Sequence, residues 1–284
     1  MFNGIAYLTL RVAAFDACRE VYIGKLGLRE LAYGGPAGRR IFIAALGRSR
    51  LEWHEDASVT PACHPDTGQP LTSMYDNGGW VSHFAFPMRG ARHVYERLAA
   101  RGIAWTCKPV DQPLGHHIVR RRLIEFADPA YLTVQFAERI DNEGRSLEPT
   151  DDPPDLPWPG CTRIDHVMLN AVDLRAKRSF YVDALGLPAT PLQPTRLGQQ
   201  CDVTVGESII ELTWQPAVQP PLHRSVVAGI GLLADDLDAA RRVLLRRGLD
   251  VSATRDIYPL PGLCRRVATL IDPDGLPLDL VQAG

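Results

Sequence analysis

The chain has 284 residues, roughly twice the ordinary length of a globular domain, which allows one large domain or two of usual size. With 45% hydrophobic and 23% charged residues, and no window near the roughly 18 unbroken apolar residues of a membrane-spanning helix, it is expected to be soluble and folded. Its formal net charge of -2 offers no long-range attraction for a polyanion, which argues against a nucleic-acid partner.

Strand-like and helix-like patterns alternate along the first half of the chain. The mixed apolar pattern of residues 5–12 is typical of a strand, and the helical segment after it ends near Gly27, a position suited to a left-handed cap. The elements expected in this half are, in order, a strand at 5–12, a helix at 15–26, strands at 40–45, 50–54 and 81–86, a helix at 89–101, and strands at 121–126 and 132–136.

The second half repeats this order of elements. Residues 22–28 (YIGKLGL) align with residues 181–187 (YVDALGL) at an offset of 159. Farther on, Asp128-Pro129 aligns with Asp272-Pro273 at an offset of 144, so the first copy carries an insertion, which lies between Trp53 and Trp80. A fixed register with one localised jump indicates two homologous modules and an internal duplication.

The repeat predicts two βαβββ units in each module, four in the chain, and an α+β fold of curved mixed sheets. The elements expected in the second half are a strand at 164–172, a helix at 174–185, strands at 202–205, 209–214 and 226–233, a helix at 236–247, and strands at 265–271 and 277–281. Residues 139–160 contain five prolines among many acidic residues, which disfavours helix and strand alike. The domains are therefore a first module at 1–138, a linker at 139–160 and a second module at 161–284.

The N-terminus and the cysteines indicate the compartment. Residues 1–10 lack the basic stretch, apolar run and small-residue cleavage site of a secretory signal. The six cysteines are scattered singly, without C-x-x-C spacing, in a chain large enough not to need disulfides. We therefore expect a cytoplasmic protein, monomeric or homodimeric, without a membrane partner.

Three features carry a resemblance to a known family. His166 stands on an opening strand, Tyr181-x-x-x-Leu-Gly-Leu follows it, and Asp272-Pro-Asp-Gly precedes a final strand. With four βαβββ units, this layout resembles the vicinal oxygen chelate superfamily, whose members include glyoxalase I, extradiol dioxygenases, fosfomycin-modifying transferases and bleomycin-binding proteins. The resemblance implies sheets that cup one divalent metal ion and a small-molecule substrate that is bound through adjacent oxygens.

In that family, side chains from the opening, fourth, fifth and last strands of paired units hold the ion. Carried over to this sequence, the front of the second module and the back of the first supply two imidazoles, a carboxylate and an amide: His166, Glu211, His83 and Gln135. The reciprocal pairing supplies no imidazole and offers Tyr7, Glu52, Gly229 and Asp279. The resemblance thus implies one competent metal site and one that decayed after duplication.

Two neutral imidazoles, one carboxylate and one amide oxygen can hold Fe²⁺, Zn²⁺, Ni²⁺ or Mn²⁺ and leave open positions for two substrate oxygens. Gln135 is either the fourth ligand or a substrate-binding residue beside a triad of the other three. The candidates for moving a proton are Glu211 and the pair His116 and His117, whose place resembles that of an acid/base histidine in extradiol dioxygenases.

Simpler explanations exist for several of these residues. Glu211 and Glu52 occupy matching places, so both could be repeat residues on an outer face. The run at 120–122 is expected on a solvated strand edge, although one of its arginines could bind a substrate carboxylate. The inserted loop is expected to act as a lid over the site.

Three functions fit this pattern. The favoured one is a metal-dependent lyase or isomerase of glyoxalase type, in which the ion stabilises an enolate-like intermediate. The alternative is an Fe²⁺-dependent, ring-cleaving dioxygenase of extradiol type. The presence of Glu125 and Gln135, where that group has Tyr and Glu, argues against it. The third is a metal-free protein that binds a small molecule such as a drug, with Trp53, Trp80 and Trp214 around a groove.

Overall fold

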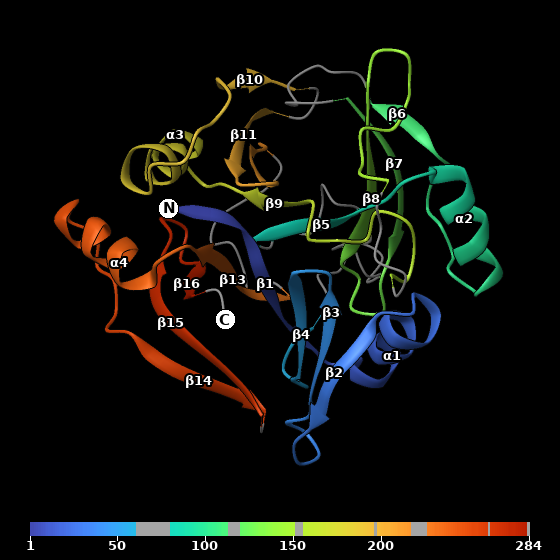
Figure 1. The fold of residues 1–284 in the computed structure, drawn as a ribbon, viewed down its shortest axis with the longest axis horizontal. Coiled ribbons are helices and arrows are strands. Elements are labelled where there is room, and N and C mark those ends of the chain that lie inside the picture. The colour runs from blue at the N-terminus through green and yellow to red at the C-terminus, as the bar shows by residue number, and fades with distance from the viewer. Residues whose placement is uncertain are drawn as a thin grey trace.

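The computed structural model describes residues 1–60, 80–112, 120–150, 156–195, 198–216, 226–260 and 262–282. Within these ranges the chain forms two curled mixed sheets of eight strands each, with few helices (Figure 1). None of the helices in the described ranges is long and apolar enough to cross a bilayer. Residues 61–79 of the inserted loop, and with them most of the expected lid, lie outside the described residues.

Four consecutive βαβββ units build these sheets, as the repeat predicts. The first unit consists of β1 (Phe2–Val12), α1 (Phe15–Arg19) with its π-helical continuation η1 (Glu20–Lys25), β2 (Arg29–Gly34), β3 (Ile41–Leu46) and β4 (Ser49–Glu55). The second unit consists of β5 (Val81–Pro87), α2 (Ala91–Ala100), β6 (Val110–Gln112), β7 (Arg120–Ala127) and β8 (Thr133–Ile140).

The second module repeats this plan. Its first unit consists of β9 (His166–Asn170), α3 (Leu174–Ser179) with its continuation η2 (Phe180–Ala184), β10 (Gln193–Pro194), β11 (Gln199–Val205) and β12 (Ser208–Trp214). Its second unit consists of β13 (Val227–Ala234), α4 (Leu237–Arg246), β14 (Arg255–Leu260), β15 (Leu263–Ile271) and β16 (Pro277–Gln282). Sequence patterns predict all of these except β2, β6, β10 and β14, which are the four edge strands of the two sheets.

Each sheet combines one unit from each module. One sheet has the order β14-β15-β16-β13-β1-β4-β3-β2, and the other has the order β10-β11-β12-β9-β5-β8-β7-β6. The units meet at antiparallel pairs, β1 with β13 and β5 with β9. The predicted pairing of the front of the second module with the back of the first is therefore confirmed, as is the fold class.

The two faces of each sheet differ in character. Phe84 and Phe86 of β5 belong to the main apolar core, and the Phe86 ring lies 5.3 Å from that of Phe136 on β8. Helix α2 packs against β7 and β8. Because successive residues of a strand point to opposite faces, His83 and Ala85 lie on the other, inner face of the curled sheet. The inner face is where the predicted site residues gather.

The segment assigned as the linker packs closely against the first module where it is described. Strand β8 extends into it as far as Ile140, which bridges to Ser146. Trp158 is buried, with its ring 4.8 Å from that of Phe136 and its Nε1–H donated to the carbonyl oxygen of Pro87 at 2.9 Å. The module boundaries themselves stay a prediction.

A serine and a glycine join the two modules at close range. Ser49 Oγ donates to the carbonyl oxygen of Ile5 at 2.6 Å and accepts from the N–H of Ile164 at 3.2 Å. In the turn before β4, Gly47 has a φ of 57°, and a Cβ at that position would lie 2.0 Å from the carbonyl oxygen of Thr162. Any side chain there would push the modules apart, so the turn requires glycine.

A tyrosine–aspartate contact anchors the helical segment of each module. Tyr22 Oη donates to Asp128 Oδ2 at 2.8 Å, and Tyr181 Oη donates to Asp272 Oδ2 at 3.4 Å. Asp272 also pairs with the buried Lys177 Nζ at 3.0 Å, whereas a cysteine stands at the matching place of the first module. Burial raises the pKa of Asp128 to about 6, although the hydrogen bond from Tyr22 opposes that shift.

Asp128 should therefore make the stability of the protein depend on pH. A carboxyl whose pKa is higher in the folded state stabilises the fold below about pH 4, and this contribution is lost as the pH rises through about 6. In the wild type, this loss lowers the unfolding free energy by up to about 3 kcal/mol over this range. We expect Asp128→Asn to abolish this pH dependence. Urea unfolding of both proteins at several pH values measures it; a difference that does not vary with pH would contradict the assignment.

Candidate metal centre

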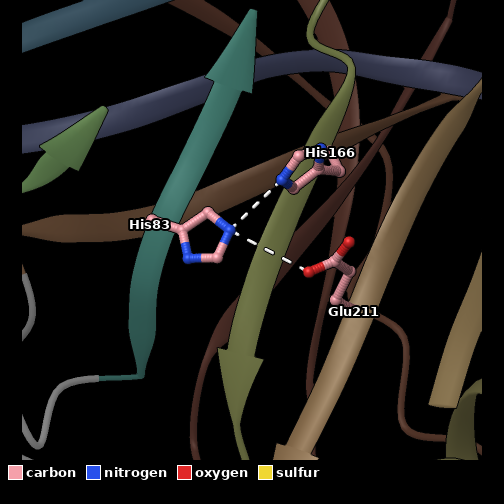
Figure 2. Close-up of side chains that lie close together, drawn as sticks. All are labelled: His83, His166 and Glu211. Carbon is pink, nitrogen blue, oxygen red and sulfur yellow. Dashed lines mark hydrogen bonds and ion pairs between the residues drawn. The ribbon is translucent and has the colours of Figure 1, made fainter. Parts of the chain in front are cut away.

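Three predicted ligands converge on the inner face of the second sheet. His83 comes from β5, His166 begins β9 and Glu211 lies on β12, and their side chains point toward one another (Figure 2). The two Nε2 atoms are 3.2 Å apart, and His83 Nε2 lies 3.9 Å from Glu211 Oε2. All three residues are buried, and one ligand atom from each lies within 4.8 Å of the other two.

Strand pairing explains why these residues meet. Strand β5 is antiparallel to β9, with Ala85 opposite His166. Strand β12 runs parallel to β9 on its other side, with Glu211 opposite Met168. Residues two positions apart in a strand lie on the same face, as His83 and Ala85 do on β5 and His166 and Met168 do on β9. The three site residues therefore share one face. The site is assembled from both modules, and neither module alone contains it.

A buried carboxylate fixes the orientation of His166. Asp165 Oδ2 lies 2.8 Å from His166 Nδ1, and Arg139 Nη2 donates to Asp165 Oδ1 at 2.7 Å. Burial alone would raise the pKa of Asp165, but Arg139 and the hydrogen bond with His166 outweigh it and hold this pKa well below its usual value. The carboxylate accepts a hydrogen bond from the Nδ1–H of a neutral imidazole, so Nε2 carries the lone pair that a metal ligand needs.

The amide of Gln135 adds a fourth acceptor. Its Nε2 donates to Glu125 Oε2 at 3.2 Å, across the β7–β8 pair, in which these two residues stand opposite each other. This hydrogen bond directs the amide oxygen, which lies 3.1 Å from His166 Nε2, toward the triad. The position of Gln135 thus allows both roles expected for it, metal ligand and substrate contact.

The donor set suits a divalent ion. Ligands about 2.1 Å from an ion and at adjacent positions around it lie about 3.0 to 3.4 Å from each other, and the two Nε2 atoms are 3.2 Å apart. Two imidazole nitrogens, a carboxylate oxygen and an amide oxygen match Zn²⁺, Ni²⁺, Mn²⁺ or Fe²⁺. The residues present therefore fit the metal that the resemblance implies.

Arg121 reaches Glu211 of the triad from a distant strand of the same sheet. Three strands separate β7 from β12, a span of about 19 Å across a flat sheet. Arg121 Nη1 nevertheless donates to Glu211 Oε1, so the sheet curls and the guanidinium lies inside it. The expectation of a solvated edge at 120–122 is wrong for Arg121, which is 1% exposed, because β6 forms the edge beyond it. The explanation that Glu211 lies on an outer face is also wrong, because Glu211 is buried on the inner face of the sheet.

The buried charges around the triad favour a cation. Asp202 of β11 stands opposite Glu211 and is fully buried. Three buried carboxylates, those of Asp165, Asp202 and Glu211, therefore lie around Arg121. Asp165 also pairs with Arg139 and Arg163, which both pair with Glu148 as well. Like charges on opposed residues of neighbouring strands repel, and an added positive charge relieves that repulsion.

The other sheet shows what the matching residues do without imidazoles. Tyr7 Oη donates to Asp279, and Thr269 Oγ1 donates to the same carboxylate. Arg265 forms a two-pronged ion pair with Glu52, and its guanidinium carbon lies 3.8 Å from the centre of the Tyr7 ring. Glu52 is thus buried and paired, like Glu211. Among the described residues, only His83, His166 and Glu211 form a group suited to a metal ion.

The fold and this cluster define a class of protein. A family model described as the Glyoxalase/Bleomycin resistance protein/Dioxygenase superfamily matches residues 163–280, which make up most of the second module. The second module is therefore similar to this superfamily.

Particular relatives narrow the comparison. A lactoylglutathione lyase from Arabidopsis thaliana is 28% identical over 218 residues, which cover 74% of this chain and 69% of that protein. A lactoylglutathione lyase from Salmonella typhimurium is 29% identical over 127 residues, which cover 43% of this chain and 93% of that protein. The crystal structure of glyoxalase I from Zea mays has a TM-score of 0.66 at 18% identity and covers 98% of this chain and 92% of its own, a likeness that shows the fold.

The structure also adds two site residues that the sequence patterns did not single out, Asp165 and Asp202. It further places beside the triad Arg121, which belongs to the run at 120–122 in which one arginine could bind a substrate carboxylate. The two aspartates stand where the first module has Ala6 and Ile43, so a comparison of the two copies position by position would have marked them. Arg121 matches an arginine in the other copy, which signals a shared role. His116 and His117, the other proton-transfer candidates, lie outside the described residues.

The two matching glutamates should respond differently to substitution. Glu211→Gln removes the carboxylate of the triad, and we expect it to weaken Zn²⁺ binding by more than the ~100-fold seen for partners outside the ligand shell. Glu52→Gln breaks the equivalent buried ion pair, at a cost of about 3 kcal/mol in stability, and should leave Zn²⁺ affinity unchanged. Metal titration and urea unfolding of both variants test this. Equal losses of Zn²⁺ affinity would overturn the asymmetry.

Asp165 should control metal affinity without touching the ion. Asp165→Asn keeps a hydrogen-bond acceptor for His166 Nδ1 but lowers the basicity of the ring, so we expect Zn²⁺ binding to weaken by about 10- to 100-fold. Competition against a chromophoric chelator measures the affinity. Unchanged affinity would mean that the Asp165–His166 contact serves folding alone.

Proposed function

We propose that this protein is a metal-dependent enzyme of glyoxalase type, a lyase or isomerase that binds a small substrate through two adjacent oxygens. The observation that carries the proposal is the convergence of His83, His166 and Glu211 from three strands onto one buried point. The buried site, in which Asp165 orients the His166 ring, supports a metal role, and the similarity to lactoylglutathione lyases supports this type of reaction.

The chain's own residues would share the work as follows. When bound, a divalent ion supplies Lewis-acid stabilisation of the negative charge that develops on the substrate oxygens. His83, His166 and Glu211 hold it, and Gln135 either completes the set or contacts the substrate. Arg121 stabilises the ionised carboxylate of Glu211, the form that accepts a proton from a carbon beside a carbonyl group.

A second candidate is the Fe²⁺-dependent dioxygenase of extradiol type. The observation that favours it is the ligand set itself, two histidines and one carboxylate, with only a neutral amide as a fourth donor. Against it, Glu125 is occupied by its hydrogen bond with Gln135 and supplies no phenol at the place of that group's tyrosine.

The metal-free binding protein has less support. Trp53, one of the three aromatics assigned to its groove, is fully buried in the core of the first module and stacks on Phe42 at 4.3 Å. Trp80 donates its Nε1–H to the carbonyl oxygen of Asp274 at 2.8 Å. These two tryptophans serve packing and do not surround a common groove.

Metal analysis and anaerobic turnover separate these functions. Protein purified without chelators should contain about one divalent ion per chain and should convert a hemithioacetal of a 2-oxoaldehyde without oxygen. His166→Ala should abolish both, whereas Glu52→Gln should abolish neither. Oxygen uptake on a catechol, lost with a ferrous chelator, would select the dioxygenase instead. A chain that carries no metal and still binds small molecules would refute both enzyme assignments.

A further inference from the structure

Arg121 is buried with hydrogen-bond donors to spare. It is 1% exposed, and its Nη1 donates to Glu211 Oε1. Within the described part of the chain, neither its Nε nor its Nη2 has a hydrogen-bond partner. A buried donor that is left unsatisfied costs about 1 to 3 kcal/mol, and more when the group is charged. Such an arrangement persists where the donors serve a ligand.

The matching arginine of the other sheet provides an internal comparison. Arg265 directs both Nη1 and Nη2 to the two oxygens of Glu52, its face covers the ring of Tyr7, and only its Nε lacks a partner among the described residues. Arg121 occupies the same repeat position and the same type of ion pair, but it uses one nitrogen where Arg265 uses two. The second oxygen of Glu211 instead lies on the side of His83. Glu211 therefore joins Arg121 to the triad through a single guanidinium nitrogen, and the other two nitrogens stay without a partner in the part of the chain that the structure describes.

The charges that face Arg121 change sign with the metal. Asp165, Asp202 and Glu211 are buried around it, and Arg139 and Arg163 pair with Asp165 and with the buried Glu148. Four carboxylates and three arginines leave one negative charge in excess. Glu125, a further acid on the inner face, is half-buried and hydrogen-bonded to Gln135. A divalent ion would leave these groups with one positive charge in excess. A ligand with one negative charge balances it.

We propose that Arg121 binds a carboxylate of the substrate beside the oxygens that chelate the metal. The spare Nη2 and Nε form the planar pair of donors that a carboxylate accepts in bidentate fashion. The substrate class is then a small 2-oxo or 2-hydroxy acid, whose carboxylate adjoins a second oxygen. This inference rests on the proposed function for the presence of the ion, and on Arg121 alone for the preference for a negative charge.

Pyruvate and hydroxyacetone are suitable probes, because both have three carbons and adjacent oxygens but only pyruvate is charged. Calorimetry on the Zn²⁺-loaded and the metal-free protein should show that the wild type binds pyruvate at least tenfold more tightly than hydroxyacetone. Arg121→Lys keeps a cation for Glu211 but loses the planar pair of donors. It should weaken pyruvate binding at least tenfold while changing hydroxyacetone and Zn²⁺ binding less than threefold. Arg265→Lys, the matched control, should change none of the three.

The outcomes separate this inference from the proposed function. No preference for pyruvate in the wild type, a result that needs no variant, overturns the role of Arg121. Equal weakening of both probes by Arg121→Lys, or loss of Zn²⁺ with them, also overturns it and shows that Arg121 only positions Glu211. A wild type that prefers pyruvate but binds no Zn²⁺ refutes the metal enzyme and leaves the carboxylate site standing.

Discussion

The candidate site depends on one contact between the modules, the antiparallel pairing of β5 with β9. Its register places Ala85 opposite His166, and thereby puts His83 one step along the same face. A slip of one residue would turn every inner-face side chain of β9 toward the apolar core. The core itself opposes such a slip, because Phe84 and Val167 are packed in it and would be driven to the polar side. Packing on one face thus secures the chemistry on the other.

The two sheets show two ways to make a polar interior stable. In one, Tyr7, Asp279, Arg265 and Glu52 pair with one another through hydrogen bonds and ion pairs, which leave only the Nε of Arg265, among the polar atoms of these four residues, without a partner in the described ranges. In the other, His166, Gln135 and Glu211 stand at the places of Tyr7, Asp279 and Glu52 and converge on one point, and the added buried Asp202 increases the negative charge. An interior of the second kind gains stability from a cation, whereas the first kind gains nothing.

The architecture was predictable because the duplication supplied each pattern twice. Gly27 and Gly186, for example, both adopt the left-handed conformation expected at the ends of the two helical segments. The four edge strands were missed because they are half-exposed, and β6 and β10 are also only three and two residues long, so their apolar alternation is weak. The buried place of Arg121 could not be read from its neighbours, since a run of three arginines is typical of a solvated edge. Only the curl of the sheet, a tertiary property, brings β7 opposite β12.

The arginine–glutamate pair that both sheets share separates their common shape from their different chemistry. In each sheet the pair joins strands that have three others between them, so it closes the curl from the inside. This ion pair holds the curled shape whether or not a ligand is bound, which explains why both copies have it. The residues that differ between the copies, His166 for Tyr7 and His83 for Gly229, stand beside this ion pair. The shared ion pair thus accounts for the common shape, and the differences beside it account for the separate chemistry of one sheet.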